Sequence, residues 1–366
     1  MKIKNASYNR LALFLTVMLL AFSLSMVAQD VNQLLLKDYN PVSIYKIPVT
    51  HVNKALFPVI DMHSHDYAKT DQEVAQWVKN MDACGIQKTI ILSGNTGAKL
   101  DATIKKYAPY GDRFEVWCGF DYTGFDQPGY GPAAVKELER CFKMGAKGVG
   151  ELSDKGLGAH YSDLHKDKGM HFDDPRMKSL YEKCAELHMP INLHLADPIW
   201  MYEKMDSTND GLMNADIWRI DLTKPGILGF DALIQTFENT VRDNPKTTFI
   251  ACHFANLNHD MGKLGEMLEK YPNLYADISA RYAESATIPR TMKAFYEKYQ
   301  DRLFYGTDMG FDADMYRITF RVLETNDEHF YENGLFHYHW AMNGFGLPKE
   351  VLKKLYQDNA VKLLKN

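Results

Sequence analysis

The residues best suited to chemistry are two histidines, His63 and His65, which end the short apolar run Val59–His65. In a β-strand, residues i and i+2 lie on the same face, so the two imidazoles can converge on one point. Later apolar runs also end in metal-binding side chains: Glu151, His194, His253 and Asp308. Imidazole and carboxylate groups together suit a divalent ion such as Zn²⁺. The pattern predicts a metal site where several strands end.

Apolar runs that alternate with amphipathic stretches must position these side chains. The expected strands are Val59–His65, Thr89–Ser93, Phe114–Asp121, Gly148–Leu152, Ile191–Ala196, Thr248–Phe254, Leu274–Ser279 and Leu303–Thr307. The expected helices are Asp71–Cys84, Pro132–Met144, Pro175–Leu187, Asp231–Asp243, Met261–Tyr271, Ile288–Tyr299 and Lys349–Leu364. Strands that are apolar on both faces suit a parallel sheet covered by helices. The alternation favours an α/β fold, a (β/α)₈ TIM barrel, over an open doubly wound sheet, and brings all strand carboxyl ends to one face.

Two connections, Asp197–Gly229 and Gly310–Gly346, are long. Both follow expected strands, so they should lie on the catalytic face, as lids, binding loops or a structural cover. We expect substrate-binding side chains on the first connection: Trp200, Tyr202 and Arg219. Arg281 follows the seventh strand and is placed either to bind an anionic group through two hydrogen bonds or to form an ordinary surface ion pair.

The first residues have the order of a secretory signal peptide. Lys2, Lys4 and Arg10 precede the apolar stretch Leu11–Val27, and Ala28 is a suitable cleavage point. An uncleaved membrane anchor is the alternative, but the apolar stretch is short for one. We therefore expect an exported, periplasmic or secreted protein without stable membrane insertion after cleavage. The expected organisation is signal peptide 1–28, N-terminal arm 29–57 and barrel domain 58–366.

The composition excludes some partners. The formal net charge is −5 and no basic stripe is present, which argues against a nucleic acid partner. We expect a small-molecule substrate, and the sequence leaves a homo-oligomer open. The five cysteines lie far apart without a CxxC pair. We expect buried structural thiols rather than a nucleophile.

With these motifs in place, the chain resembles the amidohydrolase superfamily, and specifically its amidohydrolase-2 branch. The resemblance runs from about Val59 to Leu364. It is carried by the segments Asp61–His65, Gly148–Glu151, Pro190–His194, Tyr305–Asp308 and Asp358–Leu364. It implies the barrel fold and a metal-dependent hydrolase or decarboxylase.

The resemblance also implies roles for individual residues. His63, His65 and Asp308 would bind a first metal, and Asp308 would act as the base. His194 and His253 would bind a second metal; with a single ion, His194 would complete its site and His253 would orient or activate water. Many relatives carry a carbamylated lysine on strand four, whereas this chain has Glu151 there. One or two Zn²⁺ ions, or other divalent metals, therefore remain open.

The chemistry favours a hydrolase in the first place. Zinc lowers the pKa of a bound water to about 7, and Asp308 would shuttle a proton during attack on a small amide, ester or lactone. The alternative is a non-oxidative decarboxylase of an aromatic or unsaturated acid. Two further rivals are a binding protein without turnover and a phosphoesterase acting on nucleic acid. Asp61 is placed either to orient a ligand imidazole, which a backbone carbonyl can also do, or to serve as a helix cap or turn residue.

Overall fold

The computed structural model describes residues 31–158, 169–332, 334–335 and 338–365, in two compact units, 1–41 and 42–366. The expected signal peptide, 1–28, lies outside the described residues. In the first unit the described part holds two short 3₁₀ helices, η2 (Val31–Gln33) and η3 (Leu36–Asp38). The second unit begins at Val42, and within it Ala55 N–H donates to Cys84 O at 3.0 Å. Among the described helices, none combines the length and hydropathy needed to cross a membrane.

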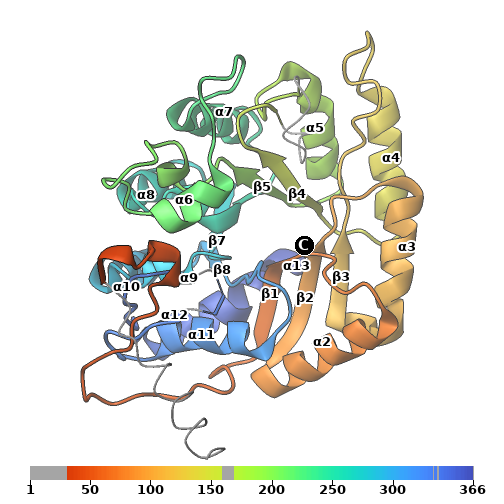
Figure 1. The fold of residues 1–366 in the computed structure, drawn as a ribbon. Helices are drawn as coiled ribbons and strands as arrows, with labels where there is room; N and C mark the ends of the chain where they lie inside the picture. Colours follow the sequence, from red (N-terminus) through yellow and green to blue (C-terminus); the bar gives the residue numbers. More distant parts are fainter. Residues whose placement is uncertain (1–30, 159–168, 333, 336–337, 366) are drawn as a thin grey trace, which may run out of the picture. The chain divides into compact units, whose positions relative to one another are not determined.

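Eight parallel strands form the centre of the second unit (Figure 1). Three of them pair in the order β1–β2–β3, and the other five in the order β4–β5–β6–β7–β8. The strands are β1 (Val59–Ser64), β2 (Ile86–Leu92), β3 (Phe114–Trp117), β4 (Val149–Asp154), β5 (Ile191–Leu195), β6 (Phe249–Ala251), β7 (Leu274–Asp277) and β8 (Leu303–Phe304). Every residue of β1 and of β5 is buried, as the continuous apolar runs predict.

Backbone hydrogen bonds join the two sheets at both edges. Cys118 and Val149 form an isolated parallel bridge between the end of β3 and β4. On the other side, Met62 N–H donates to Tyr305 O at 2.9 Å and so links β1 to the end of β8. The expected (β/α)₈ barrel is confirmed, with its strands in chain order around the barrel.

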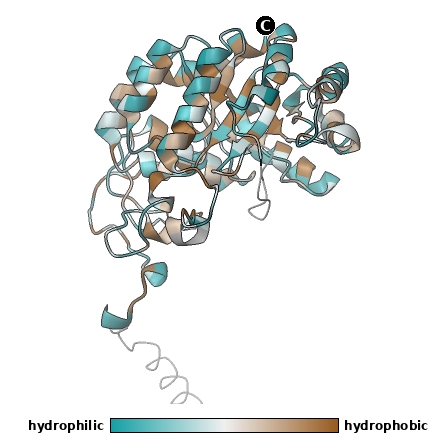
Figure 2. Cartoon of the chain, turned by 90° about the horizontal axis from the view of Figure 1, so that it is seen from above, coloured by the Kyte–Doolittle hydropathy of each residue, from teal (hydrophilic) through white to brown (hydrophobic). Residues whose placement is uncertain are grey.

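Amphipathic helices cover the strands, and Figure 2 shows hydrophilic residues on outer helix faces and hydrophobic ones toward the strands. The main α-helices are α2 (Asp71–Cys84), α3 (Gly97–Tyr107), α4 (Pro132–Lys143), α5 (Lys178–Glu186), α6 (Leu212–Trp218), α7 (Phe230–Asp243), α8 (Met261–Lys270), α10 (Pro289–Lys298) and α11 (Ala313–Glu324). The short α9 (Tyr282–Ser285) follows β7, and α12 (Lys349–Lys353), a π-helical turn (Lys354–Asp358) and α13 (Asn359–Leu364) close the unit. Helix α2 begins with a capping box between Thr70 and Glu73, and Gly85 ends it at φ 85°.

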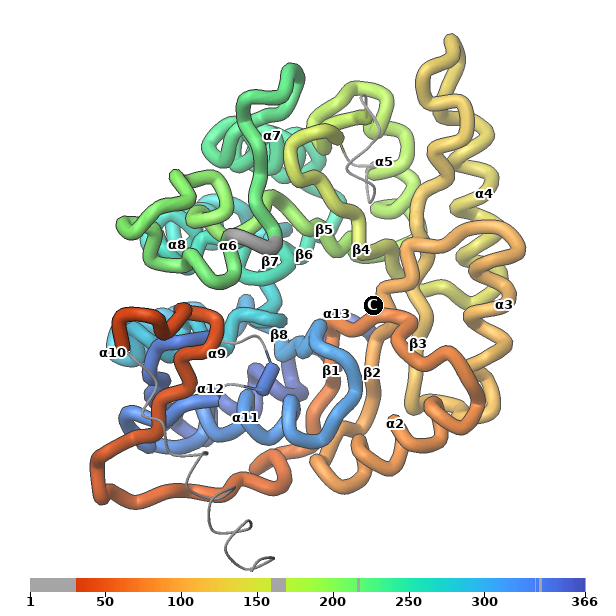
Figure 3. The backbone as a smooth tube through the Cα atoms, in the orientation of Figure 1, coloured from red at the N-terminus to blue at the C-terminus, as the bar shows by residue number. Residues whose placement is uncertain are grey.

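Several expected boundaries were wrong. β6 ends earlier than expected because the backbone turns left-handed just beyond it, at His253 (φ 57°). β3, β7 and β8 also end before their expected ends, at Trp117, Asp277 and Phe304. Helix α3 was missed because it begins at a glycine after Thr96, whose side chain makes no capping bond. The connection Gly310–Gly346 was expected as a loop but contains α11, and α6 lies within the other long connection (Figure 3).

The cysteines agree with the expectation from their spacing. All five are buried free thiols. Burial raises the pKa of Cys184 and Cys252, so neither thiol is activated for attack.

Candidate metal centre

The candidate ligands from five strands meet at the carboxyl end of the barrel. His65 Nε2 lies 2.9 Å from Asp308 Oδ1. His63 Nε2 lies 3.7 Å from that oxygen and 3.5 Å from Glu151 Oε1. The far end of Asp308, Oδ2, lies 3.6 Å from His253 Nε2. The structure therefore brings together side chains that are far apart in the sequence, as the barrel geometry predicts.

Glu151 lies between two groups of histidines. Its Oε1 is 2.8 Å from His194 Nδ1 and 3.3 Å from His253 Nε2, and its Oε2 is 3.5 Å from His65 Nε2. Two sets of possible ligand atoms share this carboxylate: His63, His65 and Glu151, and Glu151, His194 and His253. A carboxylate has two oxygens, so Glu151 can contribute to both sets.

A second contact fixes the ring orientation of three of these histidines. His65 Nδ1 lies 2.9 Å from Leu92 O, and His253 Nδ1 lies 2.9 Å from Ser279 O. His63 Nδ1 lies 2.9 Å from Asp277 Oδ2. Each ring therefore presents Nε2 to the centre, since an Nδ1–H donated to an oxygen leaves Nε2 free to bind a metal.

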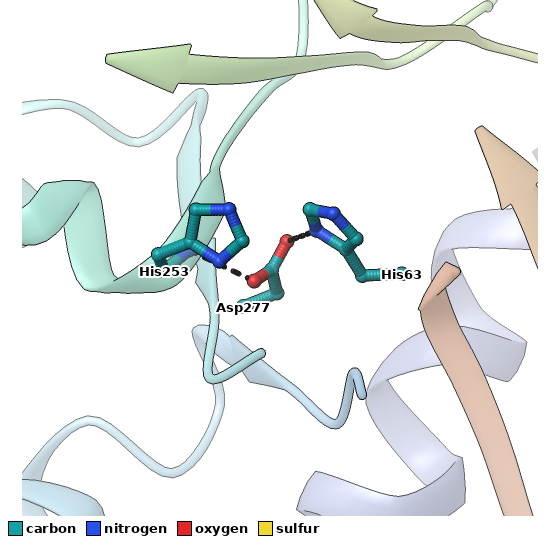
Figure 4. Close-up of side chains that lie close together, drawn as sticks. All are labelled: His63, His253 and Asp277. Carbon is teal, nitrogen blue, oxygen red and sulfur yellow. Dashed lines mark hydrogen bonds and ion pairs between the residues drawn. The ribbon is translucent and has the colours of Figure 1, made fainter. Parts of the chain in front are cut away.

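Asp277, at the end of β7, is a site residue that the sequence reasoning missed. Its side chain is fully buried between His63 and His253, and its Oδ1 accepts the backbone N–H of His253 at 3.0 Å (Figure 4). Ser279 Oγ lies 2.8 Å from His253 Nδ1. The available signal was an acidic residue near the end of a strand, but Asp277 falls inside the longer strand expected from the sequence.

Tyr67 was also missed. Its hydroxyl donates to Asp308 Oδ1 at 2.9 Å. Its ring packs edge-on against the His65 ring, with the ring centroids 5.7 Å apart. Its position two residues after His65 is the signal that could have found it. The two oxygens of Asp308 therefore differ: Oδ1 contacts Tyr67 and His65, whereas Oδ2 faces His253.

The charges in the centre strongly affect one another. Burial alone would lower the pKa of His63, but the facing carboxylates of Asp277, Asp308 and Glu151 raise it to about 10. Burial would raise the pKa of Asp308, but His63 and His65 hold it well below its usual range. For His253, burial dominates and lowers the pKa to about 4. The carboxylates thus favour the charged form of His63, whereas burial favours the neutral form of His253.

Asp61 does not hold an imidazole, whereas backbone carbonyls, the other partners expected, do. Its Oδ1 accepts the backbone N–H groups of His63 at 3.2 Å and Thr307 at 3.0 Å. Its Oδ2 accepts the Thr307 hydroxyl at 2.6 Å. Asp61 therefore joins β1 to the segment after β8, while backbone carbonyls and Asp277 orient the rings.

The expected substrate-binding residues lie in different surroundings. Arg281 is buried, and its guanidinium donates to Asn256 Oδ1 and to Ala280 O, so part of its hydrogen-bonding capacity is already used. Tyr202 accepts the N–H of Asp197 at 3.2 Å. Trp200 contacts Trp340 of the other long connection, with ring centroids 6.3 Å apart. Arg219 is exposed at the end of α6.

The donor set fits a divalent metal ion. The Nε2 atom of His63 is buried and has no hydrogen-bond partner among the described residues, whereas His194 turns Nδ1 to Glu151 and has Nε2 3.4 Å from Asp197 Oδ1. An unpartnered buried polar atom is costly unless something binds it. Four imidazoles and two carboxylates are the ligand types that zinc and manganese take in proteins.

Comparisons with solved structures show that other proteins share this fold. No curated protein matches the chain. A solved 2,6-dihydroxybenzoate decarboxylase from Rhizobium is similar in fold, at 16% identity and a TM-score of 0.54, over 85% of this chain and 99% of that one. A dihydroxybenzoic acid decarboxylase from Polaromonas, with bound manganese and the inhibitor 2-nitroresorcinol, is 15% identical with a TM-score of 0.54. The match covers 85% of this chain and 97% of that one. An uncharacterised TIM-barrel protein from Bordetella bronchiseptica is 15% identical with a TM-score of 0.53. The match covers 84% of this chain and 99% of that one.

A family model described as amidohydrolase matches residues 118–365, which is more than half of the chain. The match includes the strands that end near Glu151, His194, His253 and Asp308, whereas His63 and His65 lie before it. The chain therefore belongs to the amidohydrolase family of metal-dependent enzymes.

Proposed function

We propose that this protein is a metal-dependent decarboxylase that removes CO₂ from a small aromatic acid without an oxidant. The observation that carries the metal dependence is the convergence of His63, His65, Glu151, His194, His253 and Asp308 at the barrel mouth. The choice of decarboxylation over our first expectation, hydrolysis, is supported by the fold-level similarity to dihydroxybenzoate decarboxylases.

Asp308 would be the proton donor in this reaction. A divalent ion, when bound, would hold the substrate carboxylate and neutralise its charge. The bond between the ring carbon and the carboxylate breaks, CO₂ leaves, and the electron pair stays on the ring carbon. The proton comes from solvent: Asp308, which is ionised, takes it on Oδ2 and passes it to that carbon, since Oδ1 is held by Tyr67 and His65. His253, buried and neutral, faces Oδ2 and can keep it oriented.

Hydrolysis of an amide, ester or lactone is the second candidate. Its support is Glu151, which two ligand sets share and which therefore suits a pair of ions. In this reaction Asp308 would take a proton from the attacking water and return it to the leaving group. The same residues serve both reactions, so the substrate decides between them.

One experiment separates the two candidates. The purified chain, loaded in parallel with Zn²⁺ or Mn²⁺, is given dihydroxybenzoates and a panel of lactones in ¹⁸O-labelled water. CO₂ release without ¹⁸O in the aromatic product supports decarboxylation; ¹⁸O in a ring-opened acid would replace it by hydrolysis. Asp308→Asn serves as the inactive control. Turnover of neither panel by the loaded protein, with Asp308→Asn behaving identically, would contradict both candidates.

We also propose that the chain is exported and that residues 1–28 are removed. The support is the basic, apolar and small-residue order of that segment. Mass spectrometry of protein recovered from the periplasm or medium of a bacterial host should give a chain that begins near Gln29. A full-length chain that stays in the cytoplasm would contradict this.

A further inference from the structure

His194 differs from the other candidate ligand histidines in the ring nitrogen that faces the centre. The rings of His63, His65 and His253 present Nε2, because their Nδ1 atoms contact oxygens behind them. The ring of His194 is turned the other way, with Nδ1 2.8 Å from Glu151 Oε1. Its Nε2 is buried and has no hydrogen-bond partner among the described residues. An ion beside Glu151 would therefore meet Nδ1 of His194.

Asp197, which lies just beyond β5, faces the outer nitrogen of this ring. Its side chain is buried, and its Oδ1 lies 3.4 Å from His194 Nε2, slightly beyond the usual length of a hydrogen bond. The same oxygen accepts a hydrogen bond from Lys155 Nζ at 3.1 Å. A carboxylate beside an ammonium group stays ionised, so Asp197 offers a negative acceptor to the His194 ring.

Lys155 is itself held in place by the segment that follows β4. The neighbouring Asp154 accepts two backbone N–H groups of this turn with its Oδ1, at 2.9 and 3.0 Å. On another side, Lys155 Nζ lies 5.7 Å from the ring centroid of Trp218, the last residue of α6. The ammonium group therefore has fixed neighbours, and it can keep the carboxylate of Asp197 in a constant position.

The position of one proton connects this arrangement to the metal. A neutral imidazole carries a single N–H, and a metal ion binds the nitrogen that lacks it. An ion at Nδ1 of His194 leaves the ring proton on Nε2, where Asp197 Oδ1 is at hand as its acceptor. We propose that Asp197, held by Lys155, is a positioning residue that orients His194 and makes it a metal ligand through Nδ1. This role concerns metal binding and is the same for decarboxylation and hydrolysis.

Nitrogen NMR of the Zn²⁺-loaded chain, with ¹⁵N in its histidine rings, tests the tautomer directly. The loss of signals in His194→Gln identifies those of His194. We expect the proton of His194 on Nε2 and the metal on Nδ1, and the opposite arrangement for the other ligand histidines. A His194 ring that carries its proton on Nδ1, or that binds no metal, would overturn the proposal.

Two substitutions test the positioning residues by metal affinity. Lys155→Met keeps the side-chain length and removes the charge, and Asp197→Ala removes the carboxylate. We expect each to weaken binding of the ion beside His194 by about tenfold or more, because partners of ligand histidines typically contribute about ten- to a hundredfold. Lys155→Arg, which keeps the charge, should bind like the unchanged chain. Zn²⁺ titration against a competing chelator measures these affinities.

Lys88→Met is the matched control for Lys155→Met. The Lys88 side chain is 25% exposed, against 26% for Lys155, and it pairs with Glu115 at 3.5 Å in the amino-terminal half of β2. Its loss should leave metal affinity unchanged. Thermal unfolding of the metal-free chains shows whether each variant folds. Folded Asp197→Ala and Lys155→Met chains with unchanged affinity would overturn the proposal, and so would an equal loss in Lys88→Met. The NMR result on the unchanged chain stands even if a variant fails to fold.

Discussion

Among single residues, Asp308 has the most asymmetric surroundings in the centre. Tyr67 and His65 contact one of its oxygens, and His253 faces the other. A carboxylate with one oxygen fixed can present the other to a reacting atom in a constant orientation. Tyr67 therefore acts as a positioning residue in the proposed mechanism, because it contacts the proton carrier.

Tyr67→Phe tests this arrangement. We expect kcat to fall about tenfold while KM changes little, because one hydrogen bond to a charged group is lost and the substrate contacts remain. Steady-state kinetics on the substrate that the loaded enzyme turns over would measure this. Tyr45→Phe, at an exposed position, is the control. A change in KM alone would assign Tyr67 to substrate binding.

Among structural elements, the segment after β6 is unusual. His253, Phe254, Ala255 and Asn256 all have φ between 54° and 57°, the left-handed region that residues with a side chain adopt at a cost. Asn256 holds this turn in place. Its amide donates to Leu195 O at 2.9 Å and Ala196 O at 3.2 Å, and its Oδ1 accepts from Arg281. One side chain thus connects the segments that follow β5, β6 and β7.

Asn256→Ala should therefore lower the free energy of unfolding by about 2–3 kcal/mol, because it leaves buried groups of three segments without partners. It should also weaken metal binding, since His253 begins the same turn. Urea unfolding and metal analysis would measure both effects. Asn258→Ala, two residues further along the chain, is the comparison and should lower the free energy of unfolding by less. Equal losses would show that the connecting role is not specific to Asn256.

The stability that the connection after β4 contributes should depend on pH through His171. Its Nδ1 lies 2.8 Å from Asp154 Oδ2, and this contact raises the pKa of His171 above the ordinary value of 6.5. A raised histidine pKa means that the folded chain holds the proton more tightly. The stabilisation is complete below pH 6.5 and is lost as pH rises through the pKa of the folded state.

His171→Gln should accordingly lower the free energy of unfolding by about 1 kcal/mol at pH 5.5 and by much less at pH 8.5. Thermal unfolding of both chains at the two pH values would measure the difference. His51→Gln, at an exposed position, is the control for the loss of a histidine. A loss that grows with pH would contradict the ion pair.

For the whole molecule, metal binding and stability should be linked. A ligand that binds only the folded chain raises the free energy of unfolding by about 2.7 kcal/mol when its concentration is one hundred times its Kd. Chelation should thus lower Tm by several degrees, and Zn²⁺ or Mn²⁺ should restore it. Glu151→Gln keeps the side-chain volume but weakens the shared carboxylate, and elemental analysis should show fewer ions per chain than for the unchanged protein. An identical ion count would exclude Glu151 as a ligand.

The sequence was sufficient for the parts of the site that follow from chain order. Eight apolar runs predict the barrel, and residues at their ends, such as His65 and His194, must meet at one face. It was insufficient where contact depends on how neighbouring strands align. Asp61 shares a strand face with His63, but the neighbouring Thr307 occupies its oxygens. Asp277 reaches His63 from a strand far away in the chain, and no spacing rule reveals that.

The histidine–carboxylate network has a consequence for how the protein acquires its metal. The carboxylates of Asp277, Asp308 and Glu151 raise the pKa of His63 and so favour its protonated form. A ligand nitrogen must be free of its proton, so each ion that enters exchanges for protons that leave to the solvent. Calorimetry in buffers of different ionisation enthalpy would count them, and we expect at least one per ion. Metal uptake in this protein is then an acid–base reaction, favoured in alkaline surroundings and reversed by acid.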